Sequence, residues 1–236
     1  NNDNVVTGPD FSLLAATYGK ARGDAGYDGR ADFNFDTAVT GADFSLLASN
    51  YLQSGYTLTG EGLSQPEPRK DGIRAAAGTV VIRLSPATKT VSVGQEFTLD
   101  LMVDAGSQPV DTVETFIDFN PAYLQVLEIT PDTSALPIIL GNSFNNSLGQ
   151  ITYSAGKLGG YASGTFRLAT FRLRAVSATA GTGLTFVRQW LRNTDALYQG
   201  TSVFGSATNG TVVIQGGTTT PTWTPTRTPT RTPTIG

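Results

Sequence analysis

The segment TGPDFSLLA at residues 7–15 recurs 33 residues later as TGADFSLLA at residues 40–48. In each copy, apolar side chains recur at i, i+3, i+4 and i+7, the spacing that places them on one face of an α-helix. These side chains are Phe11, Leu14, Ala15 and Tyr18 in the first copy, and Phe44, Leu47, Ala48 and Tyr51 in the second. Gly19 is expected to end the first helix. The repeat predicts a small all-α module of two loop–helix units over residues 1–54.

The loop before the second helix carries oxygen-bearing groups at alternating positions. In the twelve residues 32–43 they stand at positions 1, 3, 5, 7, 9 and 12, and they are Asp32, Asn34, Asp36, the carbonyl of Ala38, Thr40 and Asp43. This is the spacing of an EF-hand calcium loop, which turns alternate oxygens inward around one cation, with the last carboxylate closing the shell from the start of the helix. The sequence therefore predicts a Ca²⁺ site in this second loop.

The first loop repeats the pattern but begins inside it. Positions 3, 5, 7, 9 and 12 would be Asn1, Asp3, the carbonyl of Val5, Thr7 and Asp10, while position 1 would precede the first residue of the sequence. The first calcium site is therefore expected to be incomplete or to take a ligand from elsewhere. Position 6, usually glycine in EF-hands, is Asn4 in the first loop and Thr37 in the second, and threonine adopts a positive φ at a cost.

A simpler alternative is that Asp10 and Asp43 are only helix N-caps and that the other polar residues form turns. An N-cap needs one short acceptor in front of a helix. It does not explain why oxygen-bearing groups recur at alternating positions in two copies. We therefore favour the calcium interpretation, more firmly for the second loop than for the first.

Beyond the repeat the chain divides into three further parts. Residues 55–78 are rich in Gly, Pro, Gln and mixed charge and are predicted to be a linker. Residues 79–215 contain short alternating runs, at 97–103, 166–173 and 211–214, which predict an all-β antiparallel sandwich. Residues 216–236 carry a proline at every fourth position, which favours an extended tail. The candidates for O-glycosylation in this tail are Thr222, Thr224, Thr226, Thr228, Thr230 and Thr232.

The composition excludes several classes of function. The 236 residues include no cysteine and no histidine, which removes disulfides, thiolate catalysis, His-based triads and the usual zinc and copper ligands. A net charge of −3 gives no excess of positive charge of the kind that binds nucleic acid. No stretch approaches the roughly 20 apolar residues of a membrane span, and the N-terminus lacks the regions of a signal peptide, so we expect a mature or trimmed chain.

The duplicated loop–helix pattern resembles the type I repeats of dockerins. The later part of the chain is similar to a cohesin, through FIDFNP at 116–121, GTF at 164–166 and NGTVVI at 209–214. These resemblances imply a paired calcium loop–helix domain, a jelly-roll sandwich whose flat face receives dockerin helices, and an extracellular or cell-surface location. In dockerins, partner choice depends on two loop positions and on exposed helix positions, which correspond here to Gly8, Pro9, Ala16, Gly41, Ala42 and Ser49. They are small and weakly polar, so the identity of the partner stays open.

Two functions of the assembly type follow. If the module and the sandwich fit each other, head-to-tail contact between copies builds a ring or a fibre. If each instead fits a foreign partner, the chain is an adaptor in a cellulosome-like scaffold. A flexible linker of about 23 residues spans roughly 25–30 Å on average, so contact within one chain also has to be considered.

Other functions are less favoured. Carbohydrate binding by the sandwich would use aromatic platforms, for which the candidates are Tyr153, Tyr161, Trp190 and Tyr198. A glycosidase needs only two carboxylates, but Asp118 and Glu128 have ordinary structural explanations as strand charges. We therefore expect a protein that is not an enzyme.

Overall fold

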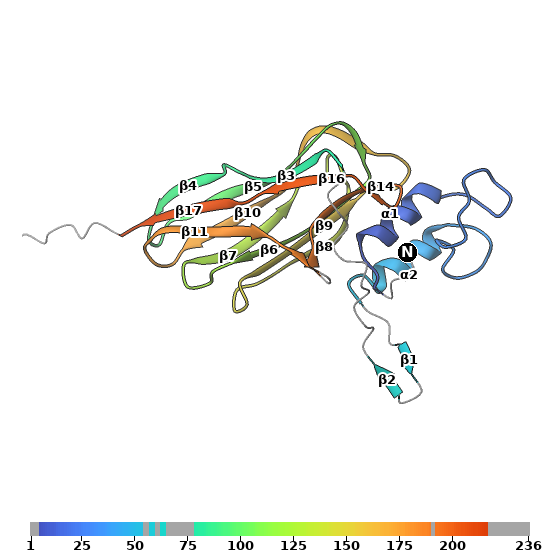
Figure 1. The fold of residues 1–236 in the computed structure, drawn as a ribbon, viewed down its shortest axis with the longest axis horizontal. Helices are drawn as coiled ribbons and strands as arrows, with labels where there is room; N and C mark the ends of the chain where they lie inside the picture. The colour runs from blue at the N-terminus through green and yellow to red at the C-terminus, as the bar shows by residue number, and fades with distance from the viewer. Residues whose placement is uncertain (1–4, 54–56, 60–61, 65–77, 190–191, 217–236) are drawn as a thin grey trace, which may run out of the picture.

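A small helical module lies at one end of an elongated β-sandwich (Figure 1). The computed structural model describes residues 5–53, 57–59, 62–64, 78–189 and 192–216. Most of the predicted linker, and the predicted tail beyond residue 216 with its candidate glycosylation sites, lie outside the described residues.

The helices and strands keep the order of the sequence. They are α1 (Gly8–Thr17), α2 (Gly41–Ser49), β1 (Thr57–Thr59), β2 (Gly62–Ser64), β3 (Val80–Ser85), β4 (Thr88–Ser92), β5 (Glu96–Val110), β6 (Thr112–Phe119), β7 (Leu124–Pro131), β8 (Ile138–Asn145), β9 (Gln150–Gly156), β10 (Ala162–Ala175), β11 (Thr179–Phe186), β12 (Arg188–Gln189), β13 (Arg192–Asn193), β14 (Asp195–Tyr198), β15 (Thr201–Ser202), β16 (Phe204–Thr208) and β17 (Gly210–Gln215).

The two helices begin in the same way. Thr7 and Thr40 are their N-caps, and each backbone N–H donates to the carboxylate three residues later, at 3.0 Å to Asp10 and 2.8 Å to Asp43. Such reciprocal caps satisfy backbone donors that the first turn leaves unpaired. After α1, Gly19 adopts a φ of 78°, as expected of the glycine that follows a helix.

Backbone hydrogen bonds between the two copies follow the same 33-residue repeat. Val39 accepts from the N–H of Gly19 and donates to the carbonyl of Lys20, both at 2.8 Å. Val6, its counterpart in the first copy, accepts from Leu52 at 2.7 Å and donates to Gln53 at 3.0 Å. Each loop is therefore held by the segment that follows the other copy's helix, and the two units form one closed pair.

The sandwich consists of two packed sheets. The first has the strand order β16-β3-β5-β10-β7. In the second, β6 pairs with β14 and β11 along one edge and with β9 along the other, β8 extends the sheet beyond β9, and β17 and β4 extend it beyond β11. The runs predicted to be strands at 97–103, 166–173 and 211–214 lie within β5, β10 and β17.

The sandwich differs from the prediction in one respect, because two of its strand pairs are parallel. They are β16 with β3 and β17 with β4. Each pair joins the end of the sandwich to its beginning, and so many residues separate the partners that no short hairpin constrains their direction. The remaining pairs are antiparallel, as predicted.

Side chains from the inner faces of both sheets fill the core. Among the largest fully buried ones are Ile82, Leu101, Ile117, Tyr153 and Phe171. Their alternation along each strand places every second side chain inside, as in the buried–intermediate pattern of β3. Among the described residues, no helix is long and apolar enough to cross a membrane.

The outer face of the five-stranded sheet carries paired charges. Arg172 on β10 bonds to Glu96 and Glu128 at 3.0 Å on each side, and Arg174 bonds to Glu96 at 2.6 Å. Further ion pairs join Arg83 to Asp104, at 2.5 Å, and Arg167 to Asp132, at 3.0 Å. This face therefore presents a ladder of ion pairs to water.

Candidate functional site

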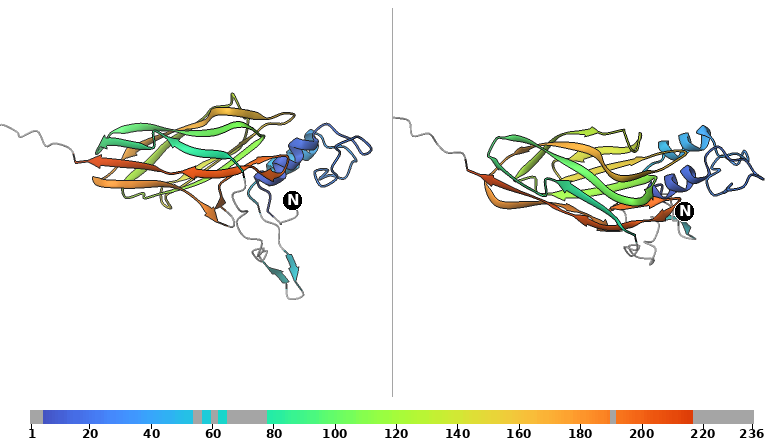
Figure 2. Two further views of the ribbon diagram at one scale, coloured as in Figure 1. Left: turned by 45° about the horizontal axis from the view of Figure 1, so that its top comes forward. Right: turned by 90° about the horizontal axis from the view of Figure 1, so that it is seen from above.

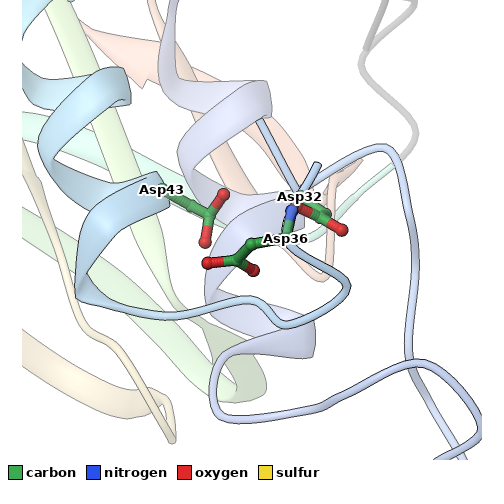
Figure 3. Close-up of side chains that lie close together, drawn as sticks. All are labelled: Asp32, Asp36 and Asp43. Carbon is green, nitrogen blue, oxygen red and sulfur yellow. The ribbon is translucent and has the colours of Figure 1, made fainter. Parts of the chain in front are cut away.

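Three carboxylates of the second loop come together as its spacing predicts. Oxygens of Asp32, Asp36 and Asp43 all lie within 4.8 Å of one another. Figure 3 shows Asp43 reaching from the start of α2 toward the loop that carries the other two. Two ligands at about 2.4 Å on opposite sides of a calcium ion are themselves about 4.8 Å apart. The three acids therefore have a spacing that fits a shared cation.

Backbone donors hold these carboxylates in place. Asp43 accepts from the N–H of Phe33 at 2.7 Å, and Asp32 accepts from Asp36 at 3.1 Å and from Thr37 at 2.9 Å. The Tyr27 hydroxyl donates to Asp32 at 2.8 Å. The loop backbone, together with Tyr27 from the segment before the loop, thus orients these acids.

The remaining predicted ligands lie around the same loop. Asn34 donates through its amide to Asp36 at 2.9 Å, and Ala38 donates its N–H to Asp36 at 3.0 Å. Thr40 caps α2, and its hydroxyl oxygen accepts from Ala42 at 3.3 Å. Asp43 serves as the capping acid with one oxygen while its other oxygen faces the loop. The capping and calcium interpretations therefore share Asp43 and do not exclude each other.

The second loop contains two strained residues. Thr37, at the position that is usually glycine, has a φ of 74°, and Phe35 has a φ of 61°. Both lie in the left-handed region, which disfavours side chains with a Cβ. The sequence predicted this cost at Thr37. Phe35 adds to it and leaves its ring 84% exposed.

The first loop is described only in part. Asn1 and Asp3 lie outside the described residues, whereas Val5, Thr7 and Asp10 are placed. Asp10 is buried and caps α1, in the same way as Asp43 caps α2. The geometry of a first calcium site therefore stays a prediction.

A second feature is the contact between α1 and the sandwich. α1 packs against β6, β9, β14 and β15, at the end of the sandwich shown from two further sides in Figure 2. Comparison of equivalent residues in the two copies of the repeat shows which side chains of α1 this contact covers. Leu13 is 9% exposed, whereas its counterpart Leu46 on α2 is 42% exposed. Ser12 is buried and its counterpart Ser45 is exposed. The sandwich therefore buries a face of α1 that the same sequence leaves open on α2.

Two buried acids of the sandwich meet this face. Asp111, just before β6, accepts from the Ser12 hydroxyl at 2.5 Å. Glu114 on β6 accepts from the Tyr51 hydroxyl at 2.9 Å and, through a long bond of 3.4 Å, from the N–H of Gly8. Burial raises the pKa of Asp111 and raises that of Glu114 to about 7. Burial also raises the pKa of Tyr51, which stays a hydrogen-bond donor.

A glycine on the sandwich makes room for the aromatic side chain of α1. A Cβ at Gly156, the last residue of β9, would lie 2.1 Å from Cε1 of Phe11. Phe11 is fully buried there and meets Phe44 edge to face, with 6.2 Å between the ring centroids. Gly156 is therefore required for this ring to reach the sheet.

The predicted partner-binding residues fall into two groups, those covered by the sandwich contact and those exposed. Gly8 is buried at the contact, and Pro9 is half-buried. The other four are exposed: Ala16, Gly41, Ala42 and Ser49. The sequence did not indicate the part that five residues play at this contact: Ser12, Tyr51, Asp111, Glu114 and Gly156. The available signal was the presence of two acids within the otherwise apolar and β-branched run at 110–117.

The candidates for other functions lie in different surroundings. Tyr153 lies in the core and donates to the carbonyl of Leu168 at 2.9 Å, so it is no surface platform, because alternation along β9 turns it inward. Tyr161 and Tyr198 meet edge to face, and Trp190 lies outside the described residues. The two acids weighed as a glycosidase pair bond to different arginines on different sheets: Asp118 to Arg192 and Glu128 to Arg172.

No protein-family model matches the sequence, and no curated protein matches it. Among the solved structures that resemble it are two cohesin–dockerin complexes. A chain of the type I cohesin–dockerin complex Coh-OlpC–Doc435 from Clostridium thermocellum aligns with a TM-score of 0.51 and 11% identity, over 60% of this chain and 96% of that one. A chain of the CaDoc0917–CaCohA2 complex, whose CaCohA2 comes from Clostridium acetobutylicum, aligns with a TM-score of 0.50 and 17% identity, over 58% of this chain and 100% of that one. Identities this low show the fold alone, and they confirm that the β-sandwich of this chain has the cohesin fold.

Proposed function

We propose that this chain is a non-enzymatic, extracellular assembly protein in which a dockerin-like, calcium-binding module docks onto a cohesin-like sandwich. The observation that carries the proposal is the burial of α1 against β6 and β9, while the same face of α2 stays exposed. A surface that is buried in one copy of a repeat and open in the other is a docking face rather than part of a module's own core.

The contact within one chain can also form between two chains. A module that leaves its own sandwich and docks on that of the next copy makes the same contacts, and repetition of this exchange gives a ring or a fibre. A tethered module has an effective concentration in the millimolar range. Closure within one chain therefore competes with assembly, and assembly is favoured where chains are crowded.

Calcium has a defined place in this proposal. The second loop would hold the ion through Asp32, Asn34, Asp36, the carbonyl of Ala38, Thr40 and Asp43. Val39, inside that loop, bonds to Gly19 and Lys20 directly after α1. An ion that rigidifies the loop would therefore also fix the end of the helix that docks. Loss of the ion would loosen both units of the closed pair.

Chelation of calcium tests the proposal. The full chain is concentrated in millimolar Ca²⁺, its assemblies are sized by light scattering and electron microscopy, and EGTA is then added. We expect the assemblies to dissociate and to re-form when Ca²⁺, but not Mg²⁺, is restored. Assemblies that survive prolonged chelation would contradict the role of calcium, and a chain that stays monomeric at every concentration would contradict self-assembly.

The adaptor function is the alternative, and the exposed face of α2 favours it because that face is open to a foreign partner. Copies with two different affinity tags distinguish the two functions. Recovery of both tags after one purification step supports self-assembly. Failure of this co-purification, combined with binding of the full chain to foreign cohesin or dockerin modules, supports the adaptor.

A further inference from the structure

The contact between Ser12 and Asp111 joins several polar groups at the docking face. The Ser12 hydroxyl donates to Asp111 at 2.5 Å and accepts from the N–H of Gly200 at 2.7 Å. The Asp111 carboxylate also accepts from the N–H of Gln199 at 2.6 Å and from the Thr112 hydroxyl at 2.8 Å. One serine of the module is thus tied to two separate parts of the sandwich.

The sandwich presents these groups from a rigid turn. Gln199 and Gly200 form the two-residue turn between β14 and β15, and their φ values are 51° and 74°. Two successive residues with positive φ are typical of a type I′ turn. The backbone of Asp111 is itself fixed, because its N–H donates to Leu197 and its carbonyl accepts from Lys157, both at 2.9 Å. The site for the serine hydroxyl is therefore preformed by the sandwich.

We propose that Asp111 and the turn at residues 199–200 are the selectivity determinant of the sandwich, which accepts a loop–helix module only when it carries a small hydroxyl side chain at the position of Ser12. This inference rests on the proposed function, and the partner that it fits is the module of a second copy of this chain. It places selectivity at the fifth residue of the helix instead of at the exposed Ala16.

The physical reason is the cost of taking one hydrogen-bond donor away from a buried acceptor. Asp111 and Ser12 are both buried. A module with an apolar side chain at this position would remove one of the three donors of the Asp111 carboxylate, the Ser12 hydroxyl. Sites built to bond a hydroxyl reject analogues that lack it far more strongly than apolar pockets reject a missing methylene.

The repeat provides a matched control. Ser45, the counterpart of Ser12, is exposed and donates to the carbonyl of Gly41 at 2.8 Å, within its own helix. Replacement of either serine by alanine raises helix propensity slightly. A difference between Ser12→Ala and Ser45→Ala therefore reports the contact with the sandwich and not the helix.

Thiol labelling of the full chain measures the contact directly. The chain has no cysteine, so Leu13→Cys introduces a single thiol at a position that docking covers. A small disulfide reagent labels this thiol only when the module is undocked, so the labelling rate gives the undocked fraction. The counterpart position on α2, which the sandwich does not cover, shows that the helix itself leaves this position open. Ser12→Ala and Ser45→Ala are each added to this background and compared in Ca²⁺, with circular dichroism as the check on folding.

We expect Ser12→Ala to accelerate labelling about 10- to 100-fold, as for loss of a hydrogen bond to a buried charge, and Ser45→Ala to leave it unchanged. Equal rates in both variants, whether raised or unchanged, would overturn the selectivity determinant. The dependence on protein concentration tests the proposed function separately. Protection that depends on Ser12 but not on concentration would keep the determinant and contradict self-assembly.

Discussion

Gly156→Ala tests the docking of α1 from the side of the sandwich. The added methyl carbon would lie 2.1 Å from Cε1, 2.7 Å from Cδ1 and 2.9 Å from Cζ of Phe11, and contacts under 3.0 Å essentially never occur. The ring would have to withdraw by about 1 Å or more, into a space already bounded by Phe44.

The cost of this clash can be bounded. Overpacking of a well-filled site typically costs about 1–3 kcal/mol, which weakens docking roughly 5- to 150-fold. The three atoms nearest to the added methyl all belong to Phe11, so the sandwich itself should stay folded. The expected result is a module that detaches more often from an intact sandwich.

Hydrogen exchange of the full chain measures this effect. Amides of residues 8–17 should lose protection in Gly156→Ala, while strands of the sandwich keep theirs. Gly181→Ala is the control, because its methyl carbon would meet Thr211 at an ordinary 3.7 Å. Phe11→Leu, combined with Gly156→Ala, should restore part of the protection. If α1 is as protected in Gly156→Ala as in the parent chain, then Phe11 does not dock against β9 and the argument fails.

Three further predictions concern the loop and the acids. Asp36→Asn should lower calcium affinity at least 10-fold by removing a charged ligand, while Asp24→Asn, outside both loops, should not; isothermal titration compares them. Thr37→Gly should raise the melting temperature of the module in Ca²⁺, by relieving about 1 kcal/mol of strain at a φ of 74°; an unchanged or lower value would mean that the strain is absent. Docking should weaken as the pH rises from about 4.5 to about 7, because the raised pKa of Glu114 means that the docked form retains a proton which the undocked form releases. The full effect corresponds to about 3 kcal/mol of docking free energy. Thiol-labelling rates measured against pH should lose this dependence above pH 5 in Glu114→Gln. If the labelling rate of that variant changes with pH as in the parent chain, Glu114 is not the cause.

The loop–helix units could be predicted because their information is local. Helix spacing, capping acids and alternating oxygens all lie within a dozen residues of one another, and the structure brings Asp32, Asp36 and Asp43 together as that spacing requires. The positive φ of Thr37 was likewise predictable from its position in the loop. The antiparallel strands of the sandwich followed from alternation in the same way.

The docking face could not be predicted because it joins distant residues. Gly156 has meaning only beside Phe11, and Asp111 only beside Ser12 and the turn at 199–200. The inward direction of Tyr153 and the parallel pairing of β16 and β17 also depend on the register of whole sheets. A single sequence carries no direct sign of such pairings.

The ladder of ion pairs on the five-stranded sheet bears on the shape of any fibre. Removing such paired charges from water usually costs more than the ions regain from one another. The sheet that carries Arg172 and Arg174 therefore resists stacking against a neighbour, whereas the opposite sheet carries the docking helix. In the proposed fibre, growth along a thread would be favoured over thickening into a bundle, so each thread would remain one subunit wide and stay dispersed.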